Sequence, residues 1–114
     1  MKTILFLMLF VSLTIGQELN ESSNLVKAKT PDAYSKIWKS SQSKWESDHT
    51  MVIYEVNRQC DGLLGLSELT LKFPEGTEEY KIIMNAVMKW PKDFAMMLYE
   101  AKKQLKAYEV LKWN

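Results

Sequence analysis

Apolar residues recur at helical spacing in the stretch WPKDFAMMLYEAKKQLKAYEVLKW, residues 90–113. Side chains three or four residues apart form a stripe that covers roughly 100° of a helix. The stripe consists of Phe94, Met97, Leu98, Ala101, Leu105 and Tyr108. The lysines at 102, 103 and 106 and the glutamate at 100 lie elsewhere on the circumference. This pattern predicts a helix from about 92 to 112 whose stripe faces the other helices.

The segment before this helix has the same periodicity. Its face is formed by Tyr80, Ile83, Met84 and Val87. Thr77 is suited to cap the start of the helix, and Pro91 disfavours helix at Trp90 because proline restricts the residue before it. Only a residue or so separates the two patterns, which is short for an antiparallel hairpin. We therefore expect a kinked C-terminal helix.

The first half of the chain carries a third pattern, which begins at Thr30-Pro31-Asp32. Proline suits the first helical position and an acid complements the helix dipole. The apolar face contains Tyr34, Ile37, Trp38, Trp45, Val52 and Val56. The pattern allows one helix over 31–60 or two helices with a break near 47–49, where Ser47 or Asp48 would cap the second. Asp61-Gly62 predicts the helix end in either case.

Glycines cluster with a proline in the segment 62–76, which predicts the main connection of the fold. This connection is unusually apolar, with leucine at 63, 64, 66, 69 and 71 and phenylalanine at 73. We expect a short helical turn near 66–71 whose leucines close one end of the core. A short strand from 69 to 73 is the lesser alternative.

The N-terminal residues MKTILFLMLFVSLTIG, with a lysine and then an apolar run, are typical of a cleaved secretory signal, which we assign to 1–16. The polar residues 17–30 contain little to bury and predict a mobile arm. The helical domain is expected over 31–114. The sequence thus predicts an all-α fold: a small bundle of three to four helices after a signal peptide, exported from the cell.

Charge and cysteine content narrow the class of protein. The formal charge of +1 falls to 0 without residues 1–16, which hold one lysine and no acid, so a nucleic-acid partner is not expected. The single cysteine, Cys60, cannot form an internal disulfide. It is either buried as a small apolar residue or pairs with a second chain in a homodimer. Asn20 begins an Asn-Glu-Ser sequon and is a candidate N-glycosylation site.

Few residues offer catalytic chemistry. His49 is the only histidine, and it would lie roughly 16 Å from Cys60 along one helix, too far for a nucleophile–base pair. One histidine and one cysteine do not supply a zinc site, and the sequence has no phosphate-binding or calcium-binding loop motif. We expect neither enzymatic activity nor a metal or cofactor.

Methionines gather around Pro91, at positions 84, 88, 96 and 97. Methionine is flexible and is used where apolar surfaces must adapt, although ordinary core filling explains the cluster as well. The functional alternative is a pocket between helices for a lipid or another hydrophobic small molecule. Its lining would be Tyr80, Met84, Val87, Trp90, Phe94 and Met97.

Met96, Tyr99 and Val110 lie nearly opposite the core stripe and predict an interaction surface. The first functional hypothesis is therefore a secreted carrier of a hydrophobic ligand. The alternative is a signalling, immune-effector or venom-type protein that acts through a receptor or partner chain. Action on a membrane surface is a third hypothesis, because residues 89–113 hold six lysines and three acidic residues, a local charge of +3.

Overall fold

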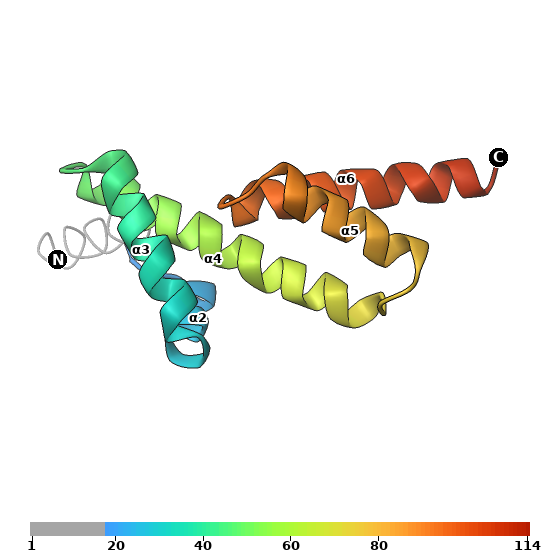
Figure 1. Ribbon diagram of the computed structural model, residues 1–114. Helices are drawn as coiled ribbons and strands as arrows, with labels where there is room; N and C mark the ends of the chain where they lie inside the picture. Colours follow the sequence, from blue (N-terminus) through green and yellow to red (C-terminus); the bar gives the residue numbers. More distant parts are fainter. Residues whose placement is uncertain (1–17) are drawn as a thin grey trace, which may run out of the picture. The chain divides into compact units, whose positions relative to one another are not determined.

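The structure, a computed structural model, describes residues 18–114 and contains no strand among them. Its helices are α2 (Glu21–Lys29), α3 (Pro31–Trp45), α4 (His49–Lys72), α5 (Glu78–Lys89) and α6 (Phe94–Lys112) (Figure 1). The all-α prediction is confirmed, but the described residues form five helices, where three to four were expected. The predicted signal peptide, 1–16, lies outside them. The described residues divide into two compact units, 18–57 and 58–114.

Residues 21–29 form helix α2, where the sequence predicted a mobile arm over 17–30. The Asn20 side chain caps this helix by accepting from the backbone N–H of Ser23. Ser23 and Val26 are buried, at 0% and 1% exposure. The local pattern gives little sign of this helix, because only a narrow face of α2 is buried and its remaining positions are polar. The mobility of the segment stays a prediction.

Asn57, in the first part of α4, holds the start of α2 within the first unit. Its Oδ1 accepts from the backbone N–H of Asn20 at 2.9 Å and from the Ser23 hydroxyl at 2.7 Å. Its Nδ2 donates to the backbone oxygen of Glu18 at 2.9 Å. These bonds tie together segments more than thirty residues apart in sequence. Such long-range pairing cannot be inferred from the local pattern.

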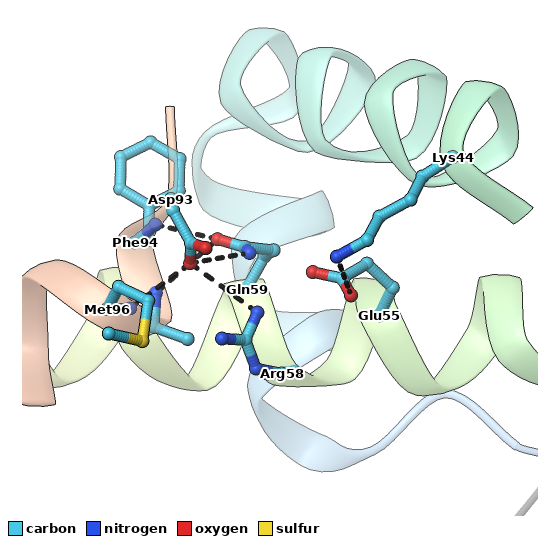
Figure 2. A network of polar contacts seen from close by, with 8 residues as sticks. Lys44, Glu55, Arg58, Gln59, Asp93, Phe94 and Met96 are labelled. Atoms are coloured by element: carbon cyan, nitrogen blue, oxygen red, sulfur yellow. Dashed lines mark hydrogen bonds and ion pairs between the residues drawn. The ribbon is translucent and has the colours of Figure 1, made fainter. Parts of the chain in front are cut away.

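Of the two alternatives for residues 31–60, the structure has two helices with a break at 46–48. Glu46 adopts a φ of 46°, which ends α3. Asp48 then caps α4 by accepting from the backbone N–H of Met51. Across the break, the Nζ of Lys44 lies 3.2 Å from the buried carboxylate of Glu55 (Figure 2).

Helix α4 does not end at Asp61-Gly62 as predicted, but continues to Lys72. The expected connection over 62–76 is therefore mostly helix, and neither the separate turn at 66–71 nor the strand exists. Gly62 is required by close packing: a Cβ there would lie 2.5 Å from backbone atoms of Phe94 and Ala95. Gly62 and Gly65 reflect the approach of α6 to α4, whereas Gly76 lies in the turn that follows α4.

The chain turns between α4 and α5 over 73–77. Gly76 has a φ of 95°, a conformation that glycine adopts without the penalty of a side chain. Thr77 caps α5, as predicted, by accepting from the backbone N–H of Tyr80 at 3.1 Å.

The predicted kink at Pro91 is wrong, because α5 and α6 form an antiparallel hairpin (Figure 1). Helix α5 stops at Lys89, so residues 90–93 are available for the turn. The backbone N–H of Asp93 donates to the oxygen of Trp90 at 3.2 Å. Proline at the second turn position and a positive φ of 72° at Lys92 in the third correspond to a type II turn.

The core of the second unit is formed by α4, α5 and α6. Its buried residues are Leu66, Ile83, Ala86, Met97 and Ala101. Eight further apolar side chains are only partly buried around them: Leu69, Phe73, Met84, Val87, Trp90, Phe94, Leu98 and Leu105. Among the helices of residues 18–114, none has the length and apolar character required to span a membrane.

Candidate interaction surface

A polar network fixes the start of α6 against α4 (Figure 2). The Oε1 of Gln59 accepts from the backbone N–H groups of Phe94 at 2.7 Å and Ala95 at 3.4 Å. Its Nε2 donates to the Oδ1 of Asp93 at 2.9 Å. One side chain from α4 thus satisfies two of the free amides that every helix N-terminus presents.

Asp93 makes further polar contacts at the N-terminus of α6. Its Oδ1 caps α6 by accepting from the backbone N–H of Met96 at 3.1 Å, and Arg58 lies 3.4 Å away (Figure 2). Together with Gln59, this carboxylate holds the first turn of α6 in one orientation about its axis.

Glu100 joins α6 to α5 one turn further on. Its carboxylate is buried, accepts from Gln104 at 2.8 Å and lies 3.3 Å from the Nζ of Lys89. The hydrogen bonds from Gln104 and Lys89 hold the pKa of this carboxyl below its ordinary value, against the opposing effect of burial. No local feature of the sequence distinguishes Glu100 from a solvent-exposed glutamate on the same helix, so its burial was not predicted.

The fixed orientation separates two faces of α6. Met97 and Ala101 of the predicted stripe are buried, and Phe94, Leu98 and Leu105 pack around the core. The opposite side is the outer face, on which we place Met96, Tyr99, Lys103, Lys106 and Val110.

Exposure on the outer face agrees with the sequence pattern. Tyr99 is 61% exposed and Val110 is 56% exposed, while Met96 is half-buried. Beyond the end of the helix, Trp113 is 79% exposed. Large exposed apolar side chains are therefore present toward both ends of α6.

The six residues predicted to line a ligand pocket lie in or near the core of the second unit. Met97 belongs to the buried cluster, and four others, Met84, Val87, Trp90 and Phe94, pack against it. Tyr80 is half-buried on the first turn of α5. A hollow of about 250 Å³ between α5 and α6 is lined by other residues: Ile82, Asn85, Ala86, Lys89, Glu100 and Gln104. Two further hollows, of about 270 and 320 Å³, contain none of the six either.

Two other predicted sites have defined positions. Cys60 is fully buried, at 0% exposure, in the part of α4 that belongs to the second unit. A disulfide to a second chain stays a prediction, and it requires this sulfur to leave its buried position. The candidate glycosylation site Asn20 is the cap of α2, and attachment of a sugar there also stays a prediction.

No group of histidine, cysteine and acidic residues within 18–114 has the arrangement of a metal site. Comparison with known proteins gives no relative: no protein family, no curated protein and no solved structure matches this chain.

Proposed function

We propose that this chain is a small secreted helical binding protein that acts by contact between the outer face of α6 and a partner protein. The observation that carries the proposal is the exposure of Tyr99 and Val110, at 61% and 56%, opposite the buried side of the same helix. Apolar residues grouped on a surface favour association, because covering them removes apolar area from water.

The contacts that hold α6 in one orientation support this proposal. Gln59 and Asp93 fix the first turn, and the Lys89–Glu100 ion pair fixes the next. A surface held in one orientation before binding loses little conformational entropy when a partner arrives. Tyrosine adds a large contact area with few rotatable bonds.

Site-specific cross-linking tests the proposal. A photo-activated phenylalanine analogue placed at Tyr99 or Val110 of the secreted protein is expected to form defined adducts with a partner in the extracellular fluid. The matched control carries the analogue at Lys39, an exposed position on α3. Absence of adducts at both outer-face positions, with the helical content intact, would contradict the proposal.

The second candidate function is transport of a hydrophobic small molecule. The observation that favours it is the set of eight apolar side chains that remain only partly buried around the core of the second unit. Separation of α5 from α6 would expose Met84, Val87 and Phe94 to such a ligand. Titration with an environment-sensitive fatty-acid probe tests it: saturable binding is expected, and its weakening by Met84→Asp without loss of helical content would locate the ligand there.

A further inference from the structure

The residues on the outer face of α6 follow a regular spacing along the sequence. Met96, Tyr99, Lys103, Lys106, Val110 and Trp113 alternate three-residue and four-residue steps. We call these six residues the outer stripe. At about 100° per residue they stay within roughly 100° of one another and extend over about 26 Å. This spacing is that of the contact seam of a coiled coil.

The outer stripe has apolar ends and a basic centre. Met96 and Tyr99 form one end, and Val110 and Trp113 the other. Lys103 and Lys106 lie between them, are exposed, and make no ion pair with any residue of 18–114. The surface therefore has apolar residues at its two ends and, between them, two lysines without an ion-pair partner among the described residues.

The two central lysines favour one kind of partner over the others that could cover the outer stripe. A second copy aligned on the same stripe would bring Lys103 and Lys106 against the same lysines, and like charges in contact oppose association. A membrane surface favours a helix whose lysines flank a continuous apolar face, whereas here the lysines interrupt the apolar residues at their centre. A helix with acidic residues at its centre and apolar residues on either side would pair with the two lysines and would also cover the apolar ends of the stripe.

We propose, building on the proposed function, that the outer stripe docks an amphipathic helix of another protein, with acidic residues at its centre and apolar residues one turn or more to either side. Apolar side chains of the partner pack on the two ends of the stripe. The partner's carboxylates pair with Lys103 and Lys106. The short seam predicts a weak, transient complex, with a Kd of about 10–100 µM.

The test uses the full secreted chain and two synthetic helical probes of 21 residues. Both carry leucine at the outer contact positions; one has glutamate at the two central contact positions and the other has lysine. The chain is expected to bind the glutamate probe at least tenfold more tightly than the lysine probe. Raising the salt from about 50 to about 500 mM should weaken binding, because exposed charges are screened.

Charge reversal provides the decisive variant. Lys103→Glu with Lys106→Glu is expected to reverse the preference, so that the lysine probe binds better. The matched control is Lys36→Glu with Lys39→Glu, which reverses two exposed lysines with the same three-residue spacing on α3. It changes the net charge equally and should alter affinity for either probe less than twofold. Circular dichroism verifies that both variants remain helical.

Several results would overturn the inference: equal affinity for the two probes, no binding of the glutamate probe, or the same loss in the control variant. It would also fail if the stripe bound vesicles of phosphatidylglycerol in preference to the glutamate probe, or if the chain self-associated through the stripe. Adducts at position 99 together with no glutamate-probe binding would refute the acidic helix and leave partner binding itself intact.

Discussion

The Nζ of Lys89, at the end of α5, lies 3.3 Å from the buried carboxylate of Glu100 on α6. This ion pair joins the two arms of the hairpin that the turn at 90–93 creates. Because Gln104 donates to the same carboxylate, its charged form has two partners within the fold. The ion pair thus connects α5 to α6, and its contribution to stability depends on whether Glu100 is ionised.

Acid should weaken the second unit through Glu100. Its pKa is lowered in the folded chain, so the ionised carboxylate stabilises the fold above its ordinary pKa, and this contribution is lost as the pH falls through the lowered value. Between about pH 6 and about pH 3, the Tm of the wild type should fall more steeply than that of Glu100→Gln. Thermal unfolding at a series of pH values measures this, and parallel curves would contradict it.

Gly62→Ala should destabilise the packing of α4 on α6. The added Cβ meets backbone atoms of Phe94 and Ala95, which cannot move aside as a side chain can. We expect a loss of about 1–3 kcal/mol in the free energy of unfolding, despite the better helix propensity of alanine. Denaturant unfolding measures it.

Gly65→Ala is the matched control for this variant. Its added Cβ meets only the side chain of Leu98, which can change its rotamer. The loss should therefore be smaller than for Gly62→Ala. An equal loss in the two variants would show that the backbone contact at Gly62 is unimportant.

Asn57→Ala should release α2 from α4 in the first unit. The variant removes the acceptor of the buried Ser23 hydroxyl and of the Asn20 backbone N–H. A buried donor without a partner costs about 1–3 kcal/mol. Amide hydrogen exchange should become faster throughout α2, while the helices of the second unit keep their protection. Unchanged exchange in α2 would mean that Val26 packing alone holds the helix.

Cys60 should react slowly with thiol reagents in the native state. Its side chain is 0% exposed, so labelling requires local opening, and we expect a rate at least about 100-fold below that of the denatured chain. The control is Ser43→Cys in a Cys60→Ala background, which places a thiol at an exposed site. A dimer band on a non-reducing gel that vanishes with reductant would instead show that Cys60 pairs with a second chain.

The core side of α6 was predictable because it depends on local periodicity alone. The positions of Met97 and Ala101 follow from helical geometry once the helix is assumed, and both are buried. The exposure of Tyr99 and Val110 was predictable for the same reason. Periodicity placed Met84 and Phe94 on inward faces of their helices. It could not distinguish a ligand cavity between those faces from a packed core.

The helical class, the cap at Thr77 and the division of α6 into a core side and an outer side could be predicted from the sequence, because they depend on neighbours within one or two turns. For the break before α4, the local pattern offered Ser47 or Asp48 as a cap but left one helix or two open. Three features became clear only from the folded chain: Gly62 lies inside a helix, Pro91 belongs to a hairpin turn, and Glu100 is buried. Each of these follows from contact with a segment more than ten residues away. A glycine, a proline or a glutamate has the same local preference whether such a contact exists or not.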